Sequence, residues 1–206
     1  PGRAVSCGVV LRADYNGLAK ASGRLMDVQK YRQERLRDLT DSIGVYALCD
    51  LDDVPIYVGQ SVDGIRTRVR RHLTSARSDI IANRQIDVWE VAYIRGWPVE
   101  DRSGIPVLEN TLFERYDSLS PLMNGKTLSV TDAALDVSVP EYQVVQVIEE
   151  SERLSRLRPQ QRLPRQISQY LSLVDYMLTV KNTAHLQKAL DAHFARLLKY
   201  HRQFLE

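Results

Sequence analysis

Cysteine is scarce in this 206-residue chain, which contains only Cys7 and Cys49. Two isolated cysteines match neither a disulfide framework nor the spacing of a metal site, so we expect a protein of the reducing cytoplasm. The sequence also lacks a signal peptide and any apolar run long enough to span a bilayer. It shows no internal repeats and no low-complexity segment, so we expect a globular protein with no membrane partner.

An excess of charge of one sign is absent too. Lys and Arg number 28 and Asp and Glu number 26, which gives a formal net charge of +2. A balance this close to neutral means that any nucleic-acid-binding surface must be a local patch. Arginines are concentrated in two stretches that can supply one, residues 66–84 and 153–165.

The most informative stretch is residues 44–73. Two short segments, 44–49 and 55–59, are rich in β-branched and aromatic residues and bounded by glycine, proline and aspartate, which is typical of strands. The turn at 50–54 is short enough for a β-hairpin. Each strand carries one tyrosine near a glycine, Tyr46 and Tyr57, and the chain then enters an arginine-rich helix. Phenols close to guanidinium groups suit a phosphate diester better than a small neutral substrate.

The helix that begins at residue 65 is amphipathic. Ile65, Val69 and Leu73 fall within one apolar stripe. Arg68 and His72 are four residues apart on one edge of this stripe, so they are neighbours that point the same way. We therefore expect both side chains to be partly shielded and to act together.

The other arginines of this helix leave two interpretations open. Arg66 and Arg70 flank the opposite edge of the apolar stripe, and Arg71 follows them. A solvated helix surface explains these residues most simply. Contact with a nucleic-acid backbone is the functional interpretation, because they lie in one of the two arginine-rich stretches.

A second helix is predicted at residues 105–116, where Pro106 suits the first turn. Glu109 falls inside the apolar face of this helix. Since burying an unpaired carboxylate is costly, we expect it to have a partner such as a metal ion or an arginine. A salt bridge to Arg68 alone is the alternative. Asn124 follows a turn that contains proline, where a structural role explains it by itself.

Together these residues resemble the signature of the GIY-YIG nucleases. The resemblance rests on five elements in order: Gly44-Val45-Tyr46, Tyr57-Val58-Gly59, the Arg68 and His72 pair, the helical Glu109, and Asn124. Their spacings fit the family, and the resemblance covers roughly residues 43–125. A histidine at the position of His72 makes the signature more similar to that of the restriction and homing branches than to that of the excision-repair branch.

Two features depart from the family pattern. The interval from Tyr57 to Arg68 is about one residue longer than usual, an addition that Gly64 can absorb. Gln60 stands where some members carry a lysine that helps to deprotonate the catalytic tyrosine. The resemblance therefore implies no such lysine assistance here.

The implied fold is α+β: a small three-stranded antiparallel sheet flanked by helices, followed by a mostly helical C-terminal part. We expect an N-terminal arm at 1–42, with a short strand near 9–11 and a helix at 24–39, and a nuclease domain at 43–125. The alternating residues 86–93 predict the third strand. Residues 95–104 then form a polar loop toward DNA, where Trp97 either stacks on DNA or is simply packed.

The C-terminal region, 126–206, is predicted to contain a helix-turn-helix at 131–148. Its second helix would begin at Pro140 and present Tyr142, Gln143 and Gln146 to base edges in the major groove. The alternative is a pair of packing helices, which the acidic residues at 149–152 favour because DNA repels them.

Two further helices are predicted to form a hairpin across residues 165–204, with a turn at 180–183. The predicted apolar stripes are Ile167, Tyr170, Leu171, Val174 and Leu178 in the first helix and Leu186, Leu190, Phe194 and Leu197 in the second. His185, His193 and His201 are spaced by eight residues, which drifts around a helix, so we interpret them as surface or boundary residues. Such a hairpin packs on its own domain or forms a dimer interface.

The resemblance implies phosphodiester hydrolysis with one divalent ion, expected to be Mg²⁺ with Mn²⁺ as a substitute. Glu109 would hold the ion, and Arg68 would face the charge that gathers in the transition state. Tyr46 would help to take the proton from the attacking water and Tyr57 would contact the phosphate, or the reverse. His72 would orient the tyrosine or the water, or share in the proton transfer. The implied catalytic set is Tyr46, Tyr57, Arg68, His72, Glu109 and Asn124, and the expected DNA contacts are Gly59, Gln60, Arg66, Arg70, Arg71, Tyr142, Gln143 and Gln146.

Three functions follow from these observations. The first is a restriction-type endonuclease that cuts double-stranded DNA at a short sequence as a homodimer. The second is a homing or mobile-element endonuclease with a helix-turn-helix reader. The third is a nucleic-acid-binding module with a decayed active site, against which the intact set of Tyr46, Tyr57, Arg68 and Glu109 argues.

Overall fold

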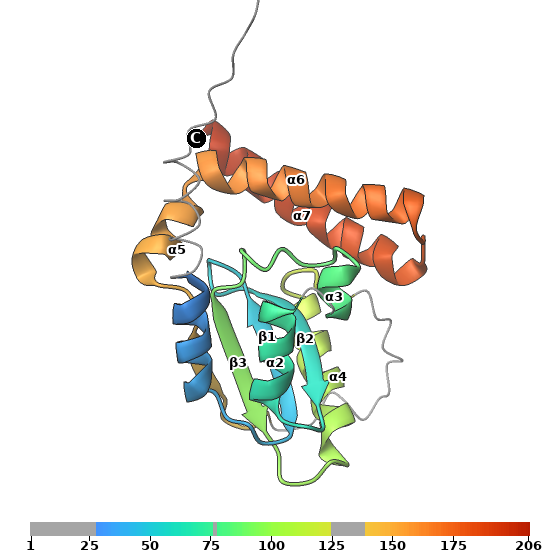
Figure 1. Ribbon diagram of the computed structural model, residues 1–206. Helices are drawn as coiled ribbons and strands as arrows, with labels where there is room; N and C mark the ends of the chain where they lie inside the picture. Colours follow the sequence, from blue (N-terminus) through green and yellow to red (C-terminus); the bar gives the residue numbers. More distant parts are fainter. Residues whose placement is uncertain (1–27, 76–77, 125–138) are drawn as a thin grey trace, which may run out of the picture.

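The computed structural model describes residues 28–75, 78–124 and 139–206 (Figure 1). Residues 28–35 are helical and continue into η1 (Leu36–Asp38). The middle of the chain forms β1 (Gly44–Cys49), β2 (Pro55–Ser61), α2 (Ile65–Thr74), α3 (Asp79–Ala82), β3 (Tyr93–Pro98) and α4 (Gly104–Asp117). The C-terminal part forms β4 (Gln143–Gln146), α5 (Glu150–Leu157), α6 (Pro159–Thr179) and α7 (Ala184–Leu205). The strand predicted near residues 9–11 and the start of the 24–39 helix lie outside the described residues.

The four strands form one antiparallel sheet in the order β2-β1-β3-β4. The α+β prediction is confirmed, but the predicted count of three strands is wrong. In the register of the sheet, Tyr46 of β1 lies between Gly59 of β2 and Gly96 of β3. The two halves of the sequence signature are therefore direct cross-strand neighbours, because a hairpin of this register brings them together.

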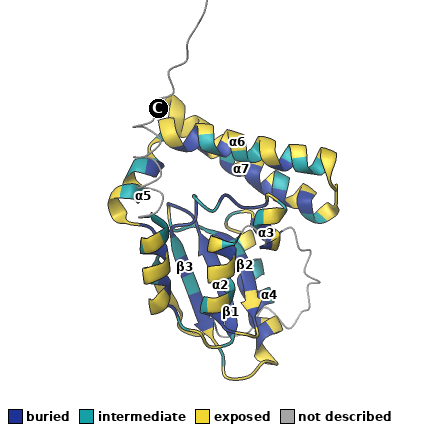
Figure 2. Ribbon diagram, viewed as in Figure 1, coloured by how far each residue is buried: buried dark blue, intermediate teal, exposed yellow. Residues whose placement is uncertain are grey.

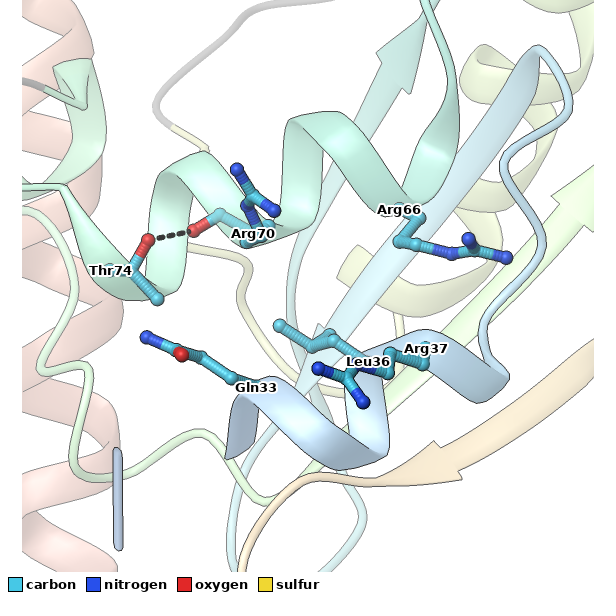
Figure 3. Close-up of a pocket in the computed structure, with 6 residues that line it drawn as sticks. All are labelled: Gln33, Leu36, Arg37, Arg66, Arg70 and Thr74. Atoms are coloured by element: carbon cyan, nitrogen blue, oxygen red, sulfur yellow. Dashed lines mark hydrogen bonds between the residues drawn. The ribbon is translucent and has the colours of Figure 1, made fainter. Parts of the chain in front are cut away.

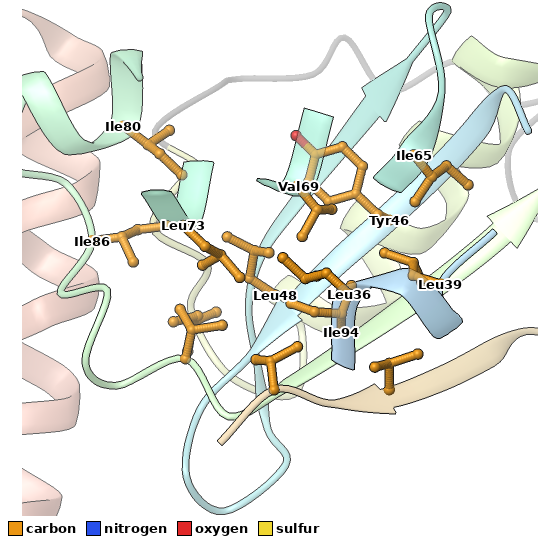
Figure 4. Packing of buried hydrophobic residues seen from close by; sticks show 14 of the residues in the cluster. Leu36, Leu39, Tyr46, Leu48, Ile65, Val69, Leu73, Ile80, Ile86 and Ile94 are labelled. Carbon is orange, nitrogen blue, oxygen red and sulfur yellow. The ribbon is translucent and has the colours of Figure 1, made fainter. Parts of the chain in front are cut away.

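Helices cover both faces of the sheet, and this explains why every residue of β1 is buried (Figure 2). Tyr46 and Leu48 point to the face covered by α2 and η1, while Val45 and Ala47 point to the face covered by α4. Figure 4 shows the ring of Tyr46 beside Val69 in the first of these cores. A strand buried on both faces is apolar at every position, as the sequence of β1 is.

The helix α2 follows its predicted pattern. Ile65, Val69 and Leu73 are buried against the sheet, as the apolar stripe indicates. The helix begins after Gly64, whose φ of 117° lies in a region that favours glycine. Arg68 and His72 lie on the same side of the helix, so the two side chains reach the same end of the sheet.

The third strand lies later in the sequence than predicted. Residues 86–92 form an irregular segment with a turn, and the strand is β3 at 93–98. The backbone N–H of Trp89 donates to Asp87 Oδ1 at 2.9 Å, a local bond that competes with strand pairing. The predicted DNA-facing loop at 95–104 is therefore wrong in its first half, and Trp97 is a fully buried core residue.

The second helix of the predicted helix-turn-helix is also wrong. Residues 143–146 form β4, which pairs with β3 in the register Ile94↔Val145. Two adjacent β-branched valines complete the free edge of β3, and this pairing overrides the helical pattern. The first predicted helix, at 131–138, lies outside the described residues.

The C-terminal hairpin is formed by α6 and α7, with its turn where it was predicted. Its inner contacts come from Leu173, Leu186 and Ala189 rather than from the whole of the predicted stripes. Leu171 and Leu178 are 65% and 81% exposed. Part of the predicted apolar face is thus at the surface, whereas the charged residues Arg162 and Arg196 are buried.

Those charged residues anchor the hairpin to the sheet domain. Arg162 is 2% exposed and binds both Glu90, through Nε at 2.8 Å, and Asp52, through Nη1 at 2.8 Å. Arg196 binds Asp50 at 2.8 Å from the adjoining helix. Buried charges of this kind require partners, since an unpaired one is strongly destabilising. The network therefore fixes α6 and α7 against the β1–β2 turn and the segment around Glu90.

Candidate active site

A cavity of about 170 Å³ opens at the outer edge of β2, between α2 and α4. Its lining residues are Tyr46, Tyr57, Gly59, Gln60, Arg68, Glu109, Asn124 and His185. The sequence places these residues in two strands, three helices and one turn. Five of the six predicted catalytic residues line this one cavity, and the sixth, His72, contacts Tyr46 behind it.

Tyr46 and His72 form a buried hydrogen-bonded pair. The Tyr46 hydroxyl lies 2.7 Å from His72 Nε2, and both side chains are almost fully buried. His72 Nδ1 lies 2.5 Å from the hydroxyl of Ser78, the residue just before α3. A consistent assignment has Tyr46 donating to Nε2 and Nδ1–H donating to Ser78 Oγ. The ring is thereby held in one orientation, with Nε2 facing the phenol.

The protonation states of this pair follow from burial. Burial raises the pKa of Tyr46 well above its ordinary value, and the nearby Arg68 guanidinium opposes this only in part. Burial, together with the nearby positive charge of Arg68, lowers the pKa of His72 to about 4. At neutral pH the resting pair is therefore a neutral phenol and a neutral imidazole. His72 Nε2, the ring nitrogen that faces the Tyr46 hydroxyl, therefore carries no proton.

Tyr57 lies next to this pair without the same contact. Its ring stacks on that of Tyr46 at a centroid distance of 6.3 Å and meets the ring of His72 edge-on at 5.9 Å. Burial raises the pKa of Tyr57 to about 12, against the opposing effect of Arg68. The two tyrosines thus share a cavity but differ in partners, since the hydrogen bond to His72 belongs to Tyr46.

Arg68 extends from α2 toward the cavity. It forms a 3.7 Å ion pair with Asp79, a residue that is itself 75% exposed. Its Nε is buried and has no hydrogen-bond acceptor within the described ranges. A buried donor without an acceptor is costly unless a ligand supplies one. The predicted alternative of a salt bridge to Glu109 alone is not what the structure has, because the ion pair of Arg68 goes to Asp79.

Glu109 reaches the cavity from α4, on the other face of the sheet from α2. It is 7% exposed, as its position within the apolar face of its helix predicts. Of the residues that line the cavity it is the one carboxylate. Among the described residues no group of three or more His, Cys, Asp or Glu side chains lies close enough to form a metal site. Within the described ranges, Glu109 is thus the acidic side chain that an ion in this cavity could use, and water and substrate oxygens are suitable further ligands.

Asn124 and Gly59 shape the edge of β2. Asn124 Oδ1 accepts from the backbone N–H of Val58 at 2.8 Å, and its amide donates to the carbonyl of the same residue. Because β2 is an edge strand, these backbone groups would otherwise lack partners. A Cβ at Gly59 would lie 2.6 Å from the Tyr46 hydroxyl, so only glycine leaves room for that phenol.

Several predicted DNA contacts lie away from this cavity. Arg66 and Arg70 are on the other side of α2, where they face Arg37, and Arg71 is exposed on the same helix. Gln143 is committed to structure, since it binds the backbone at Thr40 and Asp38.

The other two residues of the predicted reading helix also have partners in the fold. The Gln146 amide donates to Glu150 at 2.9 Å and to the carbonyl of Ile148 at 3.0 Å. Tyr142 is half exposed and packs against Trp97, with a ring distance of 5.1 Å. The helix on which base reading by Tyr142, Gln143 and Gln146 depended is absent, because these residues belong to β4 and the segment before it.

Sequence reasoning missed two residues near the site. Ser78, which fixes the His72 ring, carries no signal beyond its position before a short helix. His185 was interpreted as a surface or boundary residue, which its intermediate burial bears out, but its place in the lining of the cavity at the start of α7 was not predicted. This interpretation also holds for the exposed His201, but it is wrong for His193, which is 3% exposed. No sequence spacing links His185 to the site, because it comes from the C-terminal hairpin.

The buried neutral His72 should make stability depend on pH. Its pKa in the folded state is about 4, below the value of about 6.5 of an unfolded histidine, so the unfolded chain binds the proton first. This contribution to stability is fully present above about pH 6.5 and is lost as the pH falls toward 4. Between pH 7.5 and 5 we expect wild type to lose about 2 kcal/mol more unfolding free energy than His72→Gln. Urea titrations at both values measure this; equal losses in the two proteins would contradict it.

Comparison with known proteins identifies the class to which this domain belongs. Residues 42–120 match the GIY-YIG catalytic domain family. Searches of curated proteins and of solved structures found no significant match. Residues 42–120 are therefore a GIY-YIG catalytic domain, which is a nuclease domain and implies the hydrolysis of phosphodiester bonds. Nucleases of this family generally use a divalent metal ion, and the match does not distinguish the branches of the family.

Proposed function

We propose that this protein is a Mg²⁺-dependent, site-specific endonuclease that cuts double-stranded DNA in the manner of a type II restriction enzyme and acts as a homodimer. The observation that carries the proposal is the cavity at the edge of β2. Two phenols, a guanidinium and a carboxylate, drawn from four separate elements, line one small space. Such a set suits the binding of a phosphate diester and the transfer of one proton.

The proton path runs from the attacking water through Tyr46 to His72. The water proton passes to the Tyr46 oxygen as the phenol proton passes to His72 Nε2, 2.7 Å away. The phenol is thus both acceptor and donor, and no free phenolate is needed. This matters because burial raises the pKa of Tyr46 and would disfavour a phenolate. The product of the transfer is an imidazolium whose Nδ1–H is held by Ser78.

Arg68 and a metal ion held by Glu109 would stabilise the negative charge that develops on the phosphate. Arg68 has a buried Nε that can donate to a phosphate oxygen. Glu109 would hold Mg²⁺ through its carboxylate, with waters and phosphate oxygens as the remaining ligands, because hard oxygen donors suit this ion. A bound ion would supply positive charge that offsets the negative charge on the scissile phosphate and on the leaving 3′ oxygen. Mn²⁺ accepts the same ligands and would substitute.

A second cavity, lined by arginines, supports contact with the DNA backbone. A cavity of about 330 Å³ lies between α2 and the helical segment that ends in η1, and Arg37, Arg66 and Arg70 line it (Figure 3). Within the described ranges none of the three forms an ion pair with a carboxylate. Arg66 uses Nε to bind the carbonyl of Leu39 at 2.7 Å, which leaves Arg37 and Arg70 as the more exposed cations.

Removing two of these cations should weaken DNA binding without affecting the chemical step. For Arg37→Ala combined with Arg70→Ala, each lost phosphate contact should reduce the slope of log K against log salt by about 0.9. We expect a tenfold or greater loss of affinity at about 0.15 M salt, with an unchanged single-turnover rate at saturating DNA. Filter binding across a salt series measures the affinity and the slope, and a single-turnover cleavage assay measures the rate. The matched control is Arg202→Ala in the last turn of α7, and an unchanged slope in the double variant would argue against the backbone contact.

Homodimer formation is supported by the apolar surface of the C-terminal hairpin. Leu171, Leu178 and Phe194 are each more than half exposed. Apolar side chains gathered on one pair of helices are a common feature of interfaces. Cutting both strands of a duplex requires either two active sites or two successive cuts by one site. A dimer supplies two active sites. Sedimentation of the purified protein, alone and with duplex, would measure the assembly.

Digestion of phage DNA with Mg²⁺, followed by sequencing of the fragment ends, tests the proposed function. Discrete fragments that share a short end sequence are expected. A single rare cut would instead favour a homing enzyme, although the strand at 143–146 removes the helix on which that alternative rested. Absence of cutting with either Mg²⁺ or Mn²⁺ would contradict the proposal and favour a binding module.

A further inference from the structure

A short segment, residues 78–85, contacts both the candidate active site and the C-terminal hairpin. It consists of Ser78, α3 and the turn that follows, and it lies between α2 and the α6–α7 hairpin (Figure 1). The Ser78 hydroxyl lies 2.5 Å from His72 Nδ1, and the next residue, Asp79, pairs with Arg68 at 3.7 Å. The beginning of the segment therefore touches two residues of the predicted catalytic set.

The other end of the segment is bound by three side chains of the hairpin. Tyr176 of α6 donates its hydroxyl hydrogen to Asn83 Oδ1 at 2.9 Å. Gln169 of α6 and His193 of α7 donate to the backbone carbonyls of the next two residues, at 2.6 Å and 2.7 Å respectively. The acceptors belong to three consecutive residues, so the hairpin holds the whole end of the segment. Both helices lie beyond residues 42–120, which match the family domain.

Internal hydrogen bonds join the two ends of the segment. The carbonyl of Ser78 accepts from the N–H of Ala82 at 2.7 Å, and the carbonyl of Ile80 accepts from the N–H of Gln85 at 2.9 Å. Ile80 is 4% exposed and belongs to the core cluster that contains Tyr46. Because close-packed interiors transmit displacements, a shift at the end held by the hairpin would also move Ser78.

We propose that the α6–α7 hairpin orients His72, the proton acceptor of the proposed reaction, through the segment 78–85. Tyr176 and Gln169 are then positioning residues, which act through Ser78. The inference rests on the proposed function, because it concerns the path by which the phenol proton reaches the imidazole. A catalytic base that is itself oriented by a third group is a recurring arrangement in enzymes. Here the place of that third group is set by helices outside the matched domain.

A double variant of the full-length chain, Tyr176→Phe with Gln169→Ala, removes the two α6 contacts at side chains that do not line the catalytic cavity. We expect the single-turnover rate of duplex cleavage at saturating DNA to fall about five- to twentyfold, since a misoriented base loses part of its effect. DNA affinity should change less than about twofold, because no phosphate contact is removed.

The matched control is Tyr170→Phe with Gln160→Ala, which makes the same changes in the same helix. Within the described ranges neither of these side chains forms a hydrogen bond to the segment 78–85, so the control should cut as wild type does. A cleavage rate of the double variant within twofold of wild type would overturn the inference and leave the proposed function intact.

NMR spectra of the free protein separate a change in orientation from a general loss of stability. The Nδ1–H signal of His72, identified by its loss in His72→Gln, should shift in the double variant, because its hydrogen bond to Ser78 changes. It should stay at the wild-type position in the control. An unshifted signal in the double variant would contradict the proposed transmission, whatever the cleavage rate.

Substitutions of Ser78 test the last link to His72. Ser78→Ala removes the acceptor, and we expect its cleavage rate to fall about ten- to a hundredfold, with thermal melting as the check on folding. Ser78→Thr keeps a hydroxyl at the same place and should retain most of the rate. Cleavage by Ser78→Ala within twofold of wild type would overturn the inference. Failure of the wild-type chain to bind or cut DNA would overturn both the inference and the proposed function.

Discussion

Replacing Glu109 with glutamine should abolish DNA cleavage and leave DNA binding largely intact. Glu109 is the one carboxylate that lines the cavity, and an amide of the same shape cannot hold a divalent cation with comparable strength. We expect the single-turnover rate to fall about a thousandfold or more, which corresponds to roughly 4 kcal/mol of activation free energy. Gel electrophoresis of a cut plasmid measures the rate, and a binding titration in the absence of metal measures affinity.

The control for this variant is Glu100→Gln, an exposed carboxylate in the segment between β3 and α4. It removes the same charge from the protein without altering the cavity, so cleavage should be unchanged. The two variants together separate the effect of a local ligand from that of overall charge. Substantial turnover by Glu109→Gln in Mg²⁺ would show that the ion is held elsewhere, and the mechanism proposed for this site would then be wrong.

Replacing Tyr46 with phenylalanine should have the second large effect. The change removes one hydroxyl and keeps the ring that packs in the core beside Val69. It would break the proposed proton path, in which the hydroxyl 2.7 Å from His72 Nε2 links the attacking water to the imidazole. We expect a loss of about a hundred- to ten-thousandfold in the cleavage rate, the usual range for removing a general acid or base. A cost in stability of about 1 kcal/mol should accompany it, since His72 Nε2 loses its partner.

Tyr57→Phe is the matched comparison, because both phenols line the same cavity. Tyr57 has no hydrogen bond to His72, so its hydroxyl should contribute mainly to phosphate binding and its loss should slow cleavage less, by about tenfold. Measuring both variants at several pH values also tests His72, whose protonation at low pH should slow wild type but not Tyr46→Phe. A larger effect for Tyr57→Phe than for Tyr46→Phe would reverse the roles assigned to the two tyrosines.

Local sequence pattern predicted the elements whose burial depends on near neighbours. The stripe of α2, the hairpin of β1 and β2, and the buried position of Glu109 in α4 all follow from periodicity and turn chemistry. Each of these elements buries a face that its own residues define. The resemblance to the GIY-YIG signature then predicted a catalytic set, and five of its six residues line one cavity.

Long-range contacts decided the elements that were predicted wrongly. Residues 86–92 alternate as a strand does, yet Asp87 and Glu90 are drawn into ion pairs with Arg165 and Arg162 of a helix more than 70 residues away. Strand β3 begins only after this segment, at Tyr93, although it contains Gly96 and glycine is unfavourable within strands. In the same way, β4 forms because β3 offers it an unpaired edge, a condition that residues 143–146 do not encode by themselves.

The sequence by itself determined the chemistry of this protein, because the residue types and spacings of its signature specify a phosphate-cleaving site. Only the tertiary structure decided how that site is completed. The ring of His72 is oriented by Ser78, and the C-terminal hairpin adds His185 to the lining of the cavity. The physical reason is that periodicity reports which face of an element is buried, whereas hydrogen bonds and ion pairs between distant segments arise only when the chain has folded and their geometry is fixed.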